Sequence, residues 1–165
     1  MIRLNTVEAT LDLGMALGKQ LRAGDLVILS GSLGAGKTTL TKGIATGMGV
    51  SGRVTSPTFV IARVHRPAAD SDRTVPLVHV DAYRLSGALE LDDLDLDTDL
   101  DAAAVVIEWG EGVAERLSSD RLTIELVRLP DDTRTAELIP VGESWRVRAT
   151  ALDDSVSAGS SYGSE

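Results

Sequence analysis

The sequence contains no cysteine, and this absence removes several classes of chemistry at once. A chain without thiols forms no disulfide framework, holds no thiolate-bound metal and has no cysteine nucleophile. It also carries no evidence for an oxidising compartment. Any catalysis must therefore use oxygen-containing side chains, lysine, arginine or the two histidines.

Long apolar segments are missing as well. No apolar run approaches the ~18 residues that a membrane-spanning helix needs. The N-terminal stretch Met1 to Gly14 has no uninterrupted apolar region of the kind found in signal peptides, because Glu8 and Asp12 lie within it. We therefore expect a soluble, cytoplasmic protein with no membrane partner.

Positive charge is scarce. The 165 residues carry a formal net charge of −9 and only three lysines, Lys19, Lys37 and Lys42. A protein that holds nucleic acid needs basic side chains to neutralise the phosphates. The composition therefore predicts no broad basic face, and if the protein serves nucleic-acid chemistry, a partner must hold the nucleic acid.

The hydrophobic pattern predicts one α/β domain, and the chain is long enough for a single core. A helical stripe from Leu11 to Leu21 precedes a short strand, Leu26 to Leu29, and helical spacing resumes from Thr39 to Met48. Two later apolar runs lack strict alternation, as is typical of parallel strands covered on both faces: Leu77 to Val80 and Ala104 to Ile107.

The other expected strands include a more alternating C-terminal group. They cover Val60 to Val64, Leu122 to Leu129, Ala136 to Pro140 and Trp145 to Ala149. We thus predict an α/β fold over residues 1–152, with a central mixed, mostly parallel sheet, flanking helices and an antiparallel C-terminal part. The Ser-, Gly- and Asp-rich composition of residues 153–165 predicts a disordered tail.

Residues Gly31 to Thr38 read GSLGAGKT and fit the pattern G-x-x-x-x-G-K-[ST]. They lie between a predicted strand and a predicted helix, which is the setting of a phosphate-binding P-loop, so the α/β fold predicted over residues 1–152 is P-loop NTPase-like. Glycines let backbone N–H groups surround phosphates, and the helix N-terminus adds a positive dipole. Lys37 would bind the terminal phosphates, and the Thr38 hydroxyl would ligate magnesium. The loop therefore predicts a nucleoside triphosphate and Mg²⁺ as ligands.

The rest of the sequence favours adenine as the base. GTPases that recognise guanine are expected to show N-K-x-D, but Asn5 is the only asparagine here. A D-x-x-G motif is missing after the strand that ends at Asp81, because the next residues are Ala82, Tyr83 and Arg84. ATP is thus the expected nucleotide.

Two acids, Asp81 and Glu108, directly follow two of the predicted parallel strands. Open α/β sheets place their sites at the carboxyl ends of strands. One acid can hold magnesium, directly or through water, while the other orients the attacking water. Sequence position does not assign the two roles, and either acid alone would also fit a solvated strand end. Beside a P-loop, however, we expect at least one of them to act together with Lys37.

Three other features have ordinary structural explanations when the residues are considered alone. Thr55 to Thr58 lie where P-loop proteins carry a segment that senses the terminal phosphate, although a Ser-Pro turn is the simpler interpretation. His79 lies inside a strand and is expected to pack or hydrogen-bond rather than to catalyse. Trp109 is likewise expected to pack.

Four motifs follow one another in a characteristic order: GSLGAGKTT at 31–39, TSPTF at 55–59, HVDAYRL at 79–85 and IEW at 107–109. Together they resemble the TsaE family of bacterial ATPases, also called YjeE, and the resemblance covers residues 6–140. It implies an ATPase needed to make threonylcarbamoyladenosine at position 37 of tRNAs that read ANN codons. The implied partners are TsaB and TsaD, so that tRNA is met only through their complex, and TsaE itself is not the transferase.

The resemblance also implies roles for individual residues. It assigns ATP to Gly34, Ala35, Gly36, Lys37, Thr38 and Thr39, and magnesium to Thr38 and Glu108 with Asp81 as the Walker B acid. Ser56 to Thr58 become a phosphate-sensing switch, which replaces the interpretation as a Ser-Pro turn. Less directly, the segment Thr6 to Thr10 would border the adenine, Arg134 would approach the nucleotide and Trp109 would shape the site.

The chain departs from the family pattern at two places. Ser32 replaces the usual acidic or amide residue after the first glycine, and Leu94-Asp95 replaces the usual Leu-Gly. Two rival functions also stay open. A small-molecule kinase would need an acceptor pocket and usually an arginine-bearing lid, whereas a nucleotide-gated adaptor would bind ATP with little hydrolysis.

Overall fold

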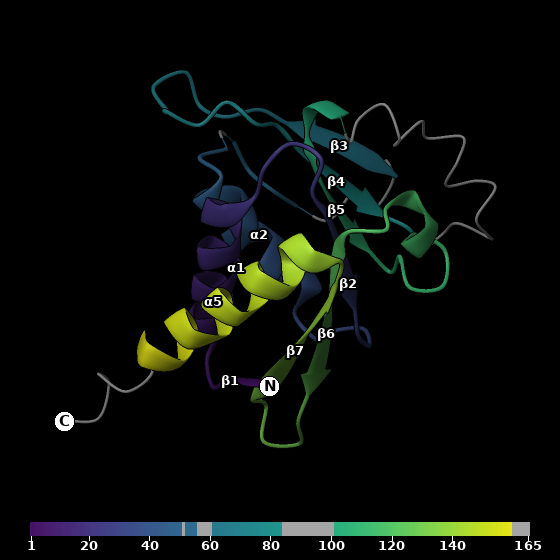
Figure 1. The fold of residues 1–165 in the computed structure, drawn as a ribbon. Coiled ribbons are helices and arrows are strands. Elements are labelled where there is room, and N and C mark those ends of the chain that lie inside the picture. Colours follow the sequence, from purple (N-terminus) through teal and green to yellow (C-terminus); the bar gives the residue numbers. More distant parts are fainter. Residues whose placement is uncertain (51, 56–60, 84–100, 160–165) are drawn as a thin grey trace.

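Helices and strands alternate along the first half of the chain, as the hydrophobic pattern predicts. The computed structural model describes residues 1–50, 52–55, 61–83 and 101–159 (Figure 1). In chain order these residues form β1 (Ile2–Leu4), α1 (Val7–Gln20), β2 (Leu26–Ser30), α2 (Lys37–Gly47), β3 (Ala62–His65), β4 (Leu77–Asp81), β5 (Ala104–Glu108), the 3-10 helix η1 (Glu115–Leu117), β6 (Arg121–Arg128), β7 (Arg134–Val141) and α5 (Glu143–Gly159).

The described strands form one seven-stranded sheet in the order β1-β7-β6-β2-β5-β4-β3. The four central strands β6, β2, β5 and β4 are parallel, whereas β1, β7 and β3 join through antiparallel pairs. The predicted α/β fold with a mixed sheet and an antiparallel C-terminal part is thus confirmed. Because β2, β5 and β4 are neighbours and parallel, their carboxyl ends lie along one edge of the sheet. At this edge β2 leads into the glycine-rich loop, β5 ends at Glu108 and β4 ends at Asp81.

Strand β2 is buried on both faces. Val27 and Leu29 belong to a core shared with residues of α1, α2 and α5, the three helices that lie together on one side of the sheet in Figure 1. Leu26 and Ile28 belong to a second core together with residues of β4 and β5. This two-sided burial explains why the strand is continuously apolar rather than alternating.

The strand predicted over Trp145 to Ala149 was wrong, because these residues lie in α5. Trp145, Ala149 and Leu152 are buried at helical spacing, whereas Val147 is 66% exposed. The alternation of apolar residues in this short window imitates a strand. The helical spacing of the buried residues becomes recognisable only when Leu152, which lies outside this window, is included.

The predicted tail, residues 153–165, starts before the end of α5. Helix α5 continues from Asp153 to Gly159, and Val156 packs against the main core. One apolar residue at helical spacing from Leu152 therefore extends the helix through a segment whose composition predicts no order. Residues 160–165 lie outside the described part of the chain.

Strand β1 was not predicted, because three residues are too few to display a period. Ile2 and Leu4 are buried and Arg3 is exposed. The strand pairs antiparallel with β7 in a register that sets Leu4 opposite Arg134. This pairing brings the beginning of α1 close to the beginning of β7.

Glycines allow α1 and α2 to pack with their backbones in contact. Gly14 and Gly18 lie on α1, and Gly43 and Gly47 lie on α2. A Cβ atom at Gly18 would lie 2.2 Å from the carbonyl oxygen of Ile44, a separation that real side chains do not adopt. The close approach holds α1 against α2 along its length, including the end of α2 that follows the glycine-rich loop.

We expect Gly18→Ala to destabilise the protein by about 1–3 kcal/mol, because the added methyl group forces the two helices apart. This loss should exceed the gain of about 1 kcal/mol that alanine offers over glycine in a helix. Thermal or urea unfolding measures the change. Asp12→Ala, at an exposed position of the same helix, is the control and should change stability by less than about 0.5 kcal/mol. A Gly18→Ala protein as stable as the original would contradict the packing.

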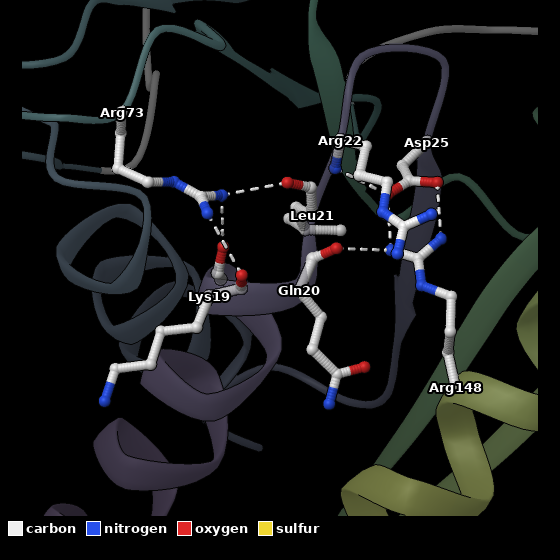
Figure 2. A network of polar contacts seen from close by, with 8 residues as sticks. Lys19, Gln20, Leu21, Arg22, Asp25, Arg73 and Arg148 are labelled. Atoms are coloured by element: carbon white, nitrogen blue, oxygen red, sulfur yellow. Dashed lines mark hydrogen bonds and ion pairs between the residues drawn. The ribbon is translucent and has the colours of Figure 1, made fainter.

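Two arginines bind the C-terminal end of α1 (Figure 2). Arg73 Nη2 donates to the carbonyl oxygen of Leu21 at 2.9 Å. Arg148 of α5 donates to the carbonyl oxygen of Gln20 at 2.7 Å and to both carboxylate oxygens of Asp25, at 2.8 and 2.6 Å. Cations are favourable here because the last carbonyls of a helix carry partial negative charge. The contacts join α1, α5 and the residue that precedes β2.

Candidate functional site

The glycine-rich loop joins β2 to α2 as the sequence predicts. Gly31 has a φ of 135°, and a Cβ atom there would lie 2.3 Å from the carbonyl oxygen of Leu126. Gly36, the residue before α2, has a φ of 111° and is left-handed. Both positions require glycine, because side chains rarely adopt such a φ. The loop thus closes tightly and ends at the N-terminus of α2, where helical N–H groups lack partners within the helix.

Lys37 is the first residue of α2, and its side chain folds back over the loop. Its Nζ atom donates to the carbonyl oxygens of Gly31 at 2.6 Å and Ser32 at 2.9 Å. The same atom lies 3.7 Å from the centre of the Trp109 ring. Burial lowers the pKa of Lys37, and the nearby carboxylate of Glu108 opposes this shift. The ammonium group therefore lies at the loop, close to an acid and an aromatic ring.

Glu108 ends β5 and is only 2% exposed. Its two carboxylate oxygens have different partners. The hydroxyl of Thr38 donates to Oε2 at 3.1 Å, while His79 Nε2 lies 2.8 Å and the Thr41 hydroxyl 3.3 Å from Oε1. The acid is thus joined to the first turn of α2 through Thr38, and the prediction that His79 hydrogen-bonds is confirmed.

Asp81 lies beside Glu108, because the two residues are paired in the register of β4 and β5. It is less buried, and its Oδ1 accepts a hydrogen bond from the backbone N–H of Tyr83 at 3.0 Å. The two acids predicted at strand ends are therefore neighbours at the edge where α2 begins. Like the carboxylate of Glu108, the Asp81 carboxylate opposes the lowering of the Lys37 pKa by burial.

Trp109 does more than pack in a core. Its φ is 62°, an uncommon value for a residue with a side chain, and its backbone N–H donates to the carbonyl oxygen of Leu29 at 3.1 Å. Its ring lies 5.0 Å from that of Tyr83, which is 68% exposed. Strained backbone of this kind tends to gather at functional sites. The residue covers Lys37 at the edge of the site.

Residues from three elements meet near Gly36. A Cβ atom at Gly36 would lie 3.8 Å from side-chain atoms of both Thr10 and Arg134. Arg134 also donates to the carbonyl oxygen of Asp132 at 2.7 Å. Thr6 caps α1, where its hydroxyl accepts the N–H of Ala9 at 3.0 Å. Thr10 and Arg134 are therefore brought to the loop, whereas Thr6 has a structural contact of its own.

The remaining predicted residues differ in what is known of their positions. Gly34 and Ala35 lie in the loop, and Thr39 lies in the first turn of α2, partly buried. Ser56, Thr58 and Arg84, together with the Leu94-Asp95 departure, fall outside the described residues. The switch therefore stays a prediction.

Sequence reasoning missed two residues close to the site. Thr41 lies one turn after Lys37 on α2 and reaches Oε1 of Glu108. Arg128 lies opposite Arg134 in the β6–β7 hairpin, and its Nη1 lies 3.7 Å from where a Cβ of Gly34 would be. The helical interval from Thr38 to Thr41 could have indicated the first, but no local pattern indicates the second.

Comparison with known proteins decides the family. The sequence model of "Threonylcarbamoyl adenosine biosynthesis protein TsaE" matches residues 4–136. The chain belongs to the TsaE family. A TsaE from Streptomyces coelicolor is 57% identical over 153 residues, which cover 90% of this chain and 99% of that protein. A Mycobacterium tuberculosis TsaE is 59% identical over 140 residues, covering 81% of this chain and 82% of the relative.

More distant members of the TsaE family also match this chain. A TsaE from Bacillus subtilis is 38% identical over 132 residues, or 79% of either chain. The crystal structure of Bacillus subtilis YdiB superposes with a TM-score of 0.73 at 29% identity and covers 96% of this chain and 94% of YdiB. These relatives place the protein in the biosynthesis of threonylcarbamoyladenosine in tRNA. Among the helices that the structure describes, none has the length and hydropathy required to span a membrane.

Proposed function

We propose that this TsaE protein is a magnesium-dependent ATPase that drives or resets the complex of TsaB and TsaD during threonylcarbamoyladenosine formation in the cytoplasm. One observation carries the proposal. The Thr38 hydroxyl and Glu108 Oε2 lie 3.1 Å apart and join the glycine-rich loop to the strand that neighbours Asp81. A hydroxyl at the loop, a buried carboxylate and a second carboxylate beside it form the set that hydrolysis of a nucleotide requires.

The loop would bind the phosphates of ATP. Residues 31–39 offer backbone N–H groups at the N-terminus of α2, where the helix dipole favours negative charge. The Lys37 ammonium now donates to carbonyl oxygens of the loop. It would exchange these neutral acceptors for phosphate oxygens, which bind a cation more strongly. Thr10 and Arg134, which meet near Gly36, would lie on the side of the ribose and adenine.

The donor set suits magnesium. Thr38 and Glu108 present oxygen atoms to one another, and Asp81 adds a further carboxylate at the adjacent strand end. Hard oxygen ligands of this kind are those that Mg²⁺ prefers, with waters and phosphates completing its shell. The ion would neutralise charge on the phosphates. We assign direct contact to Thr38 and Glu108, because these two are already joined.

Asp81 is then the residue that orients the attacking water. It is less buried than Glu108 and lies at the carboxyl end of β4, beside the loop. Its carboxylate would accept a hydrogen bond from the water and hold it in line with the terminal phosphate. Ser56 and Thr58 would report the state of that phosphate to the partner proteins.

Phosphate release separates this function from its rivals. We expect slow release from ATP by the protein alone and faster release when TsaB and TsaD are added, with no acceptor molecule present. The control is the Asp81→Asn protein, which should stay slow in both conditions. A small-molecule kinase would release no phosphate and would instead transfer it to an added acceptor. An adaptor would bind ATP without release under either condition, and either of these results would overturn the proposal.

A further inference from the structure

His79 is a buried imidazole on β4, between β5 and β3, and the proposed chemistry does not use it directly. Its side chain has no exposed surface, and its Nε2 lies 2.8 Å from Oε1 of Glu108. A proton on Nε2 makes this contact a hydrogen bond from the imidazole to the carboxylate. His79 and Asp81 are two residues apart on β4, so that their side chains leave the strand on the same face.

The two carboxylate oxygens of Glu108 have different hydrogen-bond partners. Oε1 faces His79, whereas Oε2 faces the Thr38 hydroxyl. The last torsion of a glutamate side chain is broad, so the carboxylate needs a partner to hold one orientation. Without His79, Oε1 would keep only the 3.3 Å contact with the Thr41 hydroxyl, whose single proton also has the carbonyl oxygen of Lys37 as an acceptor at 3.0 Å. This buried oxygen would then be poorly satisfied, and the carboxylate would rotate or shift toward Thr38 or Lys37.

We propose that His79 is a positioning residue that orients the Glu108 carboxylate toward the magnesium ion. The proposal rests on the proposed function, in which Glu108 contacts the metal. Partners in the outer shell of a metal site fix the orientation of the ligand, and their loss typically lowers metal affinity by about 10–100-fold. His79 would therefore set how tightly the protein binds Mg²⁺ with its nucleotide, without touching either.

Two substitutions that differ by one methylene group test this role. In His79→Gln the amide nitrogen lies as many bonds from the backbone as Nε2 does, so a donor to Glu108 remains. In His79→Asn the amide nitrogen occupies the place of Nδ1 and does not reach Oε1. The same pair at His65 is the control. His65 lies on the neighbouring strand β3 with its ring centre 6.4 Å from that of His79, and its described contacts do not include Glu108.

The measurement is binding of a fluorescent, non-hydrolysable ATP analogue at increasing Mg²⁺, and again in EDTA. We expect His79→Asn to raise the half-saturating Mg²⁺ concentration about tenfold or more, with unchanged affinity in EDTA. His79→Gln and both His65 variants should match the original protein. If His79→Asn does not fold, His79→Met, which keeps bulk but has no donor, carries the same expectation.

Three results would overturn the inference. Unchanged Mg²⁺ dependence in His79→Asn would show that Glu108 is oriented by other groups. An equal loss of binding in His79→Asn with and without Mg²⁺ would indicate a structural role alone. If the unaltered protein binds the analogue with no dependence on Mg²⁺, the magnesium site of the proposed function fails, and the inference fails with it.

Discussion

Replacing Lys37 with alanine is expected to weaken ATP binding by roughly tenfold to more than a hundredfold. The substitution removes a charge-assisted contact with phosphate that is worth about 1.5–3 kcal/mol. Because Lys37 is buried, little water competes with the ligand, and its ammonium group is therefore a strong partner for phosphate. The fold should persist, since the lysine now contacts two carbonyl groups of a loop in which Ser32 is exposed.

The matched control for this substitution is Lys42→Ala. Lys42 is an exposed lysine on the same helix, so its removal changes the net charge equally but leaves the loop untouched. Isothermal titration with ATP and Mg²⁺ gives both affinities, and a melting curve verifies folding. Equal affinity in the Lys37→Ala and Lys42→Ala proteins would mean that the loop does not bind the phosphates.

Replacing Asp81 or Glu108 by its amide is expected to impair different functions of the site. Asp81→Asn should lower hydrolysis by about 10²–10⁴-fold, the range for a group that takes part in proton transfer. Nucleotide binding should change much less. The reason is that the amide keeps the size of the side chain but is a poor acceptor for a proton from the attacking water.

Glu108→Gln should instead weaken magnesium-dependent binding. His79 needs an acceptor at the position of Oε1, and an amide that places its oxygen there turns its NH₂ group toward Thr38 and the proposed magnesium site. Single-turnover hydrolysis and nucleotide titrations with and without Mg²⁺ separate the two substitutions. If Asp81→Asn loses magnesium-dependent binding and Glu108→Gln loses only hydrolysis, the two roles are interchanged.

The core of the site could be predicted from the sequence because each part has a local pattern. A short apolar strand, glycines at fixed spacing and Lys37-Thr38 define a loop before a helix, and the structure has these elements in that order. Asp81 and Glu108 could be placed at strand ends for the same reason. That they are direct neighbours depends on β4 pairing with β5, which no local pattern determines.

What the sequence did not predict depends on contacts between distant segments. The partners of Glu108 come from β4 and α2, so His79 and Thr41 acquire their role only in the folded chain. Arg128 approaches the loop because a hairpin packs beside it. Helix α5 was mistaken for a strand because Trp145 to Ala149 alternate, while the helical face becomes evident only when Leu152 is included.

In the proposed function, hydrolysis of ATP by this chain sustains the modification of tRNA by other proteins. A net charge of −9 opposes tRNA binding by the isolated protein, and we therefore propose that the complex of TsaB and TsaD presents the tRNA. The most direct test is a reconstituted reaction in which threonylcarbamoyladenosine on tRNA is counted over many turnovers. We expect continued accumulation only when this protein and hydrolysable ATP are both present, and no such accumulation with Asp81→Asn. Full multiple-turnover modification without this protein would contradict the proposed function.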